Sequence, residues 1–161
     1  MNKALKKVIA IAMAAVSMSV GAISTTASAA NTGNTYITSF SVPNASMDWR
    51  KYTGSDCFRS KTDYTPVYFY PYSGTVSLNV RTYGCYSSSF GANKTMNGSA
   101  VYVDSVFCNI GYEYAIRSGI KESGYNYAGL ELRTTSSYSG TTLSAAWSPD
   151  SVWTSGMSYA N

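Results

Sequence analysis

Short segments in which apolar and polar residues alternate make up much of the chain from residue 36 onward. In residues 75–83, Val76, Leu78 and Val80 fall on one face, and the residues between them are mostly polar. A period of two is typical of a β-strand with one buried face. The same alternation recurs twice and points these residues inward: Ala128, Leu130 and Leu132 in 127–134, and Leu143, Ala145 and Trp147 in 141–147.

Weaker patterns predict further strands at 36–42, within 49–58, at 66–72 and 100–107, and a short last strand at 152–153. Ser73-Gly74 separates two strong strand candidates and predicts a tight hairpin turn. Residues 112–123 begin with a strand-like alternation, but Ile116 and Ile120 are four apart and Gly124 suits a helix C-cap. We therefore expect a strand that passes into a single helical turn there.

These segments amount to seven to nine short strands with turn residues between them. Such spacing is typical of an antiparallel sandwich or barrel with no more than one short helical turn. Residues 30–161 are enough for one domain with a substantial core.

The first residues of the chain have the features of a secretory signal peptide. Lys3, Lys6 and Lys7 precede an apolar run over 8–22, and Ala27-Ser28-Ala29 fits the pattern of small residues that signal peptidase requires. We predict a signal peptide over 1–29 with cleavage before Ala30, and a secreted, extracellular protein. The apolar run is shorter than the ~20 residues of a membrane-spanning helix, which disfavours the alternative of a retained anchor.

Removal of this segment changes the charge balance. The whole chain has a formal net charge of +4, but three of its 12 basic residues lie in the predicted signal peptide. The remaining nine basic residues face eight acidic ones, so the charge falls to about +1. We therefore expect no binding of nucleic acid. We also expect no stable membrane span once the signal peptide is cleaved, because the short apolar run is removed with it.

In an exported protein, cysteines are expected to form disulfides. The chain has three, Cys57, Cys85 and Cys108, so one thiol is left over in any single pairing. We favour Cys85 with Cys108, because each follows a strand-like segment and their bond closes the loop between them, which stabilises by roughly 3 kcal/mol. Cys57 is then free, buried or paired with a second molecule.

The catalytic groups of common enzymes are missing. The chain has no histidine, which removes the usual Ser-His-Asp and Cys-His arrangements and the commonest zinc ligand. Two carboxylates are enough for a glycosidase, but no spacing singles out a pair. The candidates are Asp104, Glu113, Glu122 and Glu131. We expect no enzyme activity, no cofactor and no metal site.

Tyrosine is the compositional exception, with 15 residues in the chain. In 66–72, Tyr68, Tyr70 and Tyr72 alternate with Val67 and Phe69. If the latter two point inward, the three tyrosines form a stripe on which sugar rings or peptide side chains can stack. The alternative, which we favour because nothing in the pattern of cross-strand pairing demands a ligand, is that the stripe stabilises the sheet through cross-strand pairs.

Three stretches combine strand and turn residues in a recognisable order: RSKTDYTPVY from Arg59, KESGYNYAGL from Lys121 and WSPDS from Trp147. Together they resemble a group of small secreted proteins of Gram-positive bacteria whose function is uncharacterised. In its small size and export signal the chain also resembles lactococcin-type β-sandwich bacteriocins, although it lacks their histidines. The resemblance implies a bacterial source and a single antiparallel β-sandwich over 30–161.

Three hypotheses for function follow. The first is a secreted, non-enzymatic sandwich that binds a partner, such as cell-wall glycan or a surface protein, with an oligomeric state that the sequence leaves open. The second is a bacteriocin-like antagonist of competing cells. The third is an atypical hydrolase that works without histidine.

Overall fold

The structure, a computed structural model, describes residues 32–46, 49–54, 56–86, 105–137 and 139–160. These residues form ten strands and no helix. The strands are β1 (Thr35–Val42), β2 (Arg50–Lys51), β3 (Arg59–Ser60), β4 (Val67–Ser73), β5 (Leu78–Cys85), β6 (Val106–Cys108), β7 (Tyr114–Ile116), β8 (Tyr127–Thr134), β9 (Thr141–Ser148) and β10 (Ser158–Ala160). The predicted signal peptide lies outside the described residues, as does most of the predicted strand at 100–107.

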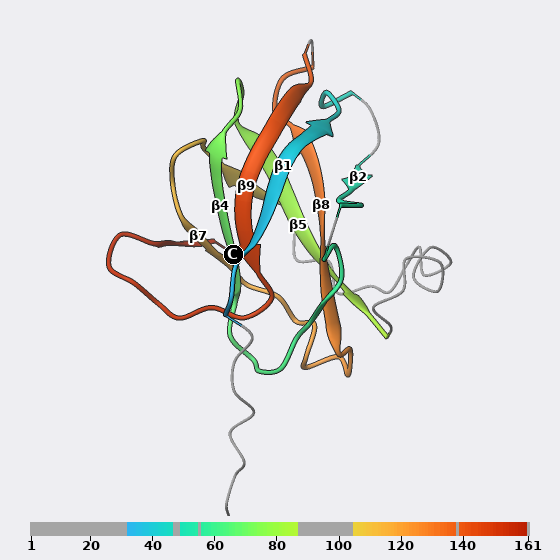
Figure 1. Ribbon diagram of the computed structural model, residues 1–161, viewed down its shortest axis with the longest axis vertical. Helices are drawn as coiled ribbons and strands as arrows, with labels where there is room; N and C mark the ends of the chain where they lie inside the picture. The colour runs from blue at the N-terminus through green and yellow to red at the C-terminus, as the bar shows by residue number, and fades with distance from the viewer. Residues whose placement is uncertain (1–31, 47–48, 55, 87–104, 138, 161) are drawn as a thin grey trace, which may run out of the picture.

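The strands belong to two sheets (Figure 1). Sheet A has the order β1-β9-β4-β7-β10, and sheet B has the order β2-β8-β5-β6, with β3 also paired to β8. Every pairing is antiparallel except that of β10 with β7. The described part of the chain is therefore all-β and sandwich-like, as expected.

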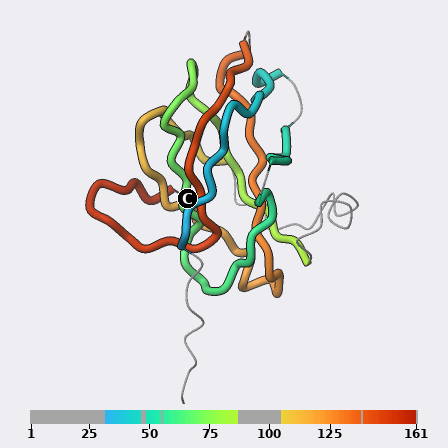
Figure 2. Tube along the Cα trace, viewed as in Figure 1, coloured from blue at the N-terminus to red at the C-terminus, as the bar shows by residue number. Residues whose placement is uncertain are grey.

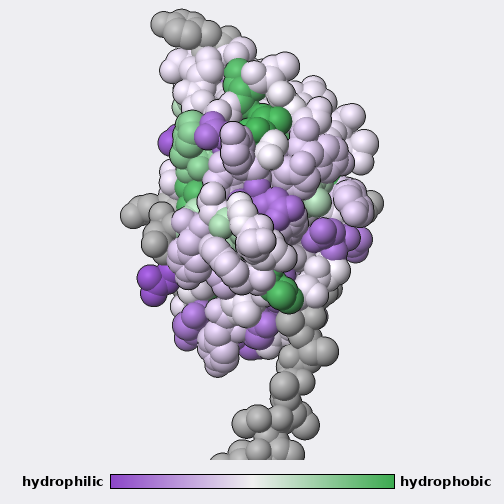
Figure 3. Space-filling model, turned by 90° about the vertical axis from the view of Figure 1, so that its left-hand side faces the viewer, coloured by the Kyte–Doolittle hydropathy of each residue, from purple (hydrophilic) through white to green (hydrophobic). Residues whose placement is uncertain are grey.

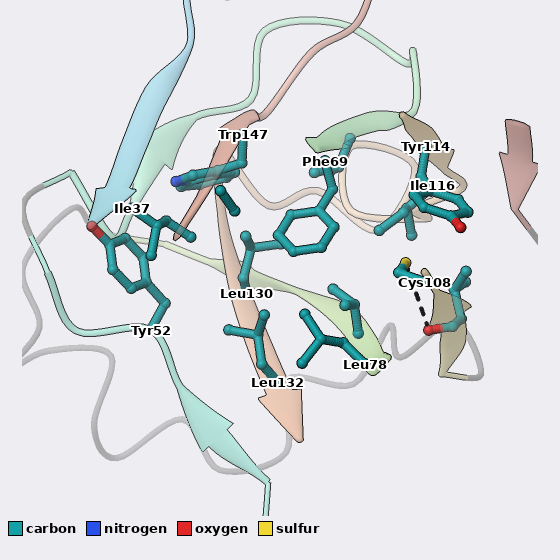
Figure 4. Close-up of a cluster of buried hydrophobic side chains, with 14 of the residues drawn as sticks. Ile37, Tyr52, Phe69, Leu78, Cys108, Tyr114, Ile116, Leu130, Leu132 and Trp147 are labelled. Carbon is teal, nitrogen blue, oxygen red and sulfur yellow. Dashed lines mark hydrogen bonds between the residues drawn. The ribbon is translucent and has the colours of Figure 1, made fainter. Parts of the chain in front are cut away.

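The core lies between the two sheets. Figure 4 shows Phe69 and Trp147 of sheet A facing Leu130, Leu132 and Leu78 of sheet B. All the inward residues predicted for 127–134 and 141–147 are buried, because alternation along a strand places every second side chain on the same face. Val67 and Phe69 are buried too, so the predicted alternation of β4 is confirmed.

The predicted hairpin at Ser73-Gly74 is wrong. β4 pairs with β9 and β7 in sheet A, whereas β5 pairs with β8 and β6 in sheet B. A two-residue hairpin requires positive φ in its turn, and Gly74 does not adopt it. The segment crosses from one sheet to the other instead, and Thr75 N–H donates to Thr141 Oγ1 at 2.9 Å.

Two other predictions change in detail. After β7, residues 120–124 form a non-helical turn in place of the expected helical turn, and Gly124 ends it with a φ of 83°. Residues 152–153 are not a strand; the chain loops outward there and returns to pair as β10 with β7, as the red segment of Figure 2 shows. Among the described residues, none belongs to a helix long and apolar enough to cross a membrane.

Candidate functional site

The outer face of sheet A collects tyrosines from strands that are far apart in the sequence. The register places Tyr36 of β1, Ala146 of β9 and Tyr70 of β4 in one row. Residues directly opposite each other share a face, so these side chains point the same way. A second row places Tyr68 of β4 beside Ala115 of β7 and Tyr159 of β10. We call Tyr36, Tyr68, Tyr70, Tyr72 and Tyr159 the tyrosine face.

Small residues separate the rings of the tyrosine face. Ala146 lies between Tyr36 and Tyr70, and Ala115 lies between Tyr68 and Tyr159. Tyr36, Tyr72 and Tyr159 are 66%, 41% and 53% exposed, whereas Tyr68 and Tyr70 are half-buried. Because tyrosine has an apolar ring and a polar tip, such a face offers both stacking area and hydroxyls to a ligand.

Ring contacts link neighbouring members of this surface. The ring centroids of Tyr70 and Tyr72 lie 5.8 Å apart, and exposed Trp153 lies 6.2 Å from Tyr159. In Figure 3, which looks onto the side of the molecule that carries β7 and the C-terminal loop, strongly apolar and strongly polar residues form separate spots on a mostly pale surface. Intermediate hydropathy over a wide area fits tyrosines, serines and threonines better than an apolar docking patch.

A cleft of about 330 Å³ opens at one end of the tyrosine face. It is lined by Thr32, Asn34, Tyr68, Glu113, Ser148, Ser151, Val152, Thr154 and Met157. The Tyr68 hydroxyl is hydrogen-bonded to the Glu113 carboxylate. Burial and this carboxylate raise the pKa of Tyr68 to about 12, so the phenol stays protonated and acts as the donor.

A buried ion pair supports the wall of the cleft. Lys61 Nζ lies 2.6 Å from Asp150 Oδ1, and both side chains are fully buried. Lys61 also donates to the Thr65 carbonyl at 2.6 Å, and Asp150 Oδ2 accepts from the Thr62 amide at 3.1 Å. Both charges therefore have the hydrogen-bond partners that a buried pair requires.

This network reaches the cleft through two of its serines. Ser148 Oγ donates to the Asp150 carbonyl at 2.7 Å, and the Ser151 amide donates to Thr65 Oγ1 at 3.0 Å. The serines that line the cleft are thus held by the main chain of Asp150 and by the side chain of Thr65. Pre-positioned polar groups lower the entropy lost when a ligand binds.

The three stretches that carry the sequence resemblance meet at this end of the molecule. The Lys61 amide donates to the Asn126 carbonyl at 2.8 Å, and Arg59 donates to the Trp147 carbonyl at 3.3 Å. Lys61 and Asp150 join the first stretch to the third. Contacts between the three stretches therefore support the wall of the cleft. The alternation of apolar and polar residues did not predict these contacts.

The predicted stripe, Tyr68, Tyr70 and Tyr72, lies together on one face of β4, as the alternation required. Sequence reasoning missed Tyr36, Tyr159 and Trp153 as its neighbours. Tyr36 stood in a predicted strand, but alternation does not reveal which strand lies beside which. Tyr159 belongs to a strand of three residues that has no detectable pattern.

The candidate carboxylates are not brought together. Glu113 lines the cleft on sheet A. Glu131 lies in sheet B, where Arg81 Nε contacts it at 2.6 Å and Lys51 at 3.9 Å. Glu122 is exposed in a turn, and Asp104 lies outside the described residues. Among the residues described, no group of three or more Cys, Asp or Glu is placed to hold a metal ion.

The predicted Cys85–Cys108 disulfide is absent, and the register rules it out. All three cysteines are free. Cys108 pairs with Leu78, seven residues from Cys85 along β5, which is roughly 23 Å at ~3.3 Å per residue. Cys108 also points into the core (Figure 4), whereas Cys85 belongs to a separate cluster. A disulfide requires Cα atoms within about 7 Å.

Comparison with known proteins gives a family but no function. No curated protein and no solved structure matches the chain. Residues 24–151, which include β1 to β9 and most of the cleft, match the family described as "Protein of unknown function (DUF2712)". Since the match spans well over half of the sequence, the chain belongs to the DUF2712 family.

Proposed function

We propose that this protein is exported and, without catalysing a reaction, binds a cell-surface or extracellular glycan on the tyrosine face and in its cleft. The observation that carries the proposal is the set of exposed tyrosines, drawn from three strands of sheet A, next to a cleft with positioned polar groups. Export is supported by the charged, apolar and small-residue pattern of residues 1–29.

The chemistry of the surface favours a sugar over a protein partner. Sugar rings present C–H faces that stack on tyrosine and hydroxyls that need hydrogen-bond partners. The cleft supplies the Glu113 carboxylate as an acceptor, and Thr32 and Thr154 also line it. Among the described residues that line the cleft, Glu113 is the charged one, which suits a neutral glycan.

A direct test measures binding of the purified protein to insoluble cell-wall glycan. Replacing both Tyr36 and Tyr159 with Ser removes two exposed rings without entering the core. At about 1 kcal/mol per ring, we expect binding to weaken by roughly ten-fold or more. Phe107→Ser is the matched control, because it removes a ring that is 54% exposed on β6 of the other sheet.

The outcomes separate the competing hypotheses. Loss of binding in the double variant but not in the control, with unchanged melting of both, supports a glycan site on the tyrosine face. Equal binding by all three proteins would remove this face as the site. Growth inhibition of related bacterial strains by protein that does not bind glycan would favour the bacteriocin-like antagonist instead.

A further inference from the structure

The three cysteines occupy two separate places in the molecule. Cys108 is part of the main core between the sheets, against which the partly buried Cys57 also packs. Cys85 belongs to a second cluster, made of Phe58, Tyr83 and Cys85, against which Cys57 and Tyr127 pack. We call these five residues the satellite cluster. It therefore contains two of the three thiols.

The register shows how the satellite cluster forms. Leu78 and Val80 of β5 point into the core, so Tyr83 and Cys85 project from the outer face of sheet B. Tyr127 of β8 pairs with Cys85 on one side and with Ser60 of β3 on the other. The residues just before β3, Cys57 and Phe58, cover this face, which places Cys57 against the cluster that contains Cys85.

Electrostatics and exposure agree with this proximity. Burial, with a smaller contribution from a charge on the Cys57 sulfur, raises the pKa of Cys85 to about 12 although Lys51 acts to lower it. Cys85 is buried, whereas Cys57 is half-buried and stands outside any strand. An external reagent therefore reaches Cys57 first, and the segment that carries Cys57 is not held by a strand ladder.

We propose that Cys57 and Cys85 form a disulfide in the oxidised protein, with a small-molecule disulfide as the oxidant. Cys57 gives up its proton, and its sulfur attacks the small disulfide and displaces one thiolate. Cys85 then gives up its proton, attacks the mixed disulfide at the Cys57 sulfur and displaces the second thiolate. The protein loses two protons and two electrons, which the oxidant takes up as it leaves as two thiols.

The bond would attach residues 52–60 to the outer face of sheet B. β2 and β3, at the two ends of that segment, have only two residues each, and both pair with the edge of β8. Such short strands open readily on their own. The inference is independent of the proposed glycan site, which lies on the other sheet.

The test treats the purified native protein with oxidised glutathione and then alkylates the remaining thiols. We expect a mass lower by two hydrogens, one alkylated residue, Cys108, after unfolding, and a non-reducing peptide map that links Cys57 to Cys85. Cys57→Ser and Cys85→Ala should abolish the bond. Cys108→Ala, the matched control, should retain it. The oxidised form should melt at a higher temperature than the reduced form.

Two results would overturn the proposal. One is that all three thiols are alkylated after oxidation of the native wild-type protein. The other is a map in which Cys57 is linked to a second chain or to Cys108. Because the map is read on the wild-type protein, the decision stands even if a cysteine variant does not fold.

Discussion

Lys61 and Asp150 form an ion pair in which two opposite charges are withdrawn from water. Taking such charges out of water is expensive, and only mutual attraction and further hydrogen bonds repay it. Asp63 adds a second carboxylate at 3.4 Å from Lys61 Nζ. The pair therefore fixes the geometry of the 61–65 and 148–151 segments more than it adds net stability.

The first prediction concerns this pair. Asp150→Asn removes the nearer carboxylate from the buried Lys61 ammonium, which keeps Asp63 at 3.4 Å and the Thr65 carbonyl, so we expect the free energy of unfolding to fall by about 2–3 kcal/mol. Urea denaturation measures the change. The control is Glu122→Gln, which removes a carboxylate from an exposed turn and should change stability by less than about 0.5 kcal/mol. A loss below about 1 kcal/mol for Asp150→Asn would mean that the pair is not buried as described.

The second prediction concerns Tyr68 and alkaline pH. Its pKa is raised from 10.0 to about 12 in the folded protein. In the unfolded chain the phenol ionises near its ordinary value, so the unfolded state releases the proton first as pH rises. The stability associated with the protonated phenol is fully present below pH 10 and is lost as pH rises from about 10 to about 12.

Tyr68→Phe removes this titration and keeps the ring. Its free energy of unfolding should therefore fall less steeply than that of the wild type between about pH 10 and about pH 12. Urea midpoints at several pH values measure the two slopes. Glu113→Gln should flatten the dependence in part, because it removes the carboxylate that holds the Tyr68 proton. Equal slopes for wild type and Tyr68→Phe would contradict the assignment.

At the scale of elements, the sequence predicts a strand well where the strand is long and has one buried face. The inward residues of β8 and β9 follow from alternation alone. The same pattern does not say which strand pairs with which, and so it placed β4 and β5 in one hairpin although they lie in different sheets. Pairing is decided by which faces bury together, which is a property of the assembled core.

Short strands escape prediction for a different reason. β3 has two residues and β10 has three, too few to show a period. A close approach between elements is equally hidden. Tyr83 lies over Gly129, where an added Cβ would meet the Tyr83 ring at 2.6 Å, and nothing in the alternation of β8 indicates that this glycine makes room for a ring.

At the scale of the whole molecule, the candidate site exists only because distant parts of the chain meet. The stripe on β4 was visible in the sequence, whereas Tyr36 joins it through the pairing of β1 with β9, and Tyr159 through the pairing of β10 with β7. The support of the cleft likewise joins residues 88 to 89 positions apart. A site of this kind depends on both sheets staying packed.

The third prediction follows from that dependence. A single core cluster draws on strands of both sheets, and Trp147 is fully buried in it. The other two tryptophans lie nearer the surface: Trp49 stacks between Arg81 and Arg133, and Trp153 is exposed beside Tyr159. Changing Trp49 and Trp153 to Phe therefore leaves Trp147 as the reporter of the interface between the sheets.

In that variant, urea unfolding followed by Trp147 fluorescence and by far-ultraviolet circular dichroism should give coincident midpoints, because neither sheet can keep its buried face without the other. The parent protein, followed by circular dichroism, controls for the substitutions and should show the same slope with denaturant. Fluorescence that changes at lower urea than the dichroism would show sheets that separate before they unfold. The tyrosine face would then persist on a sheet A that has already lost the packing of its inner face.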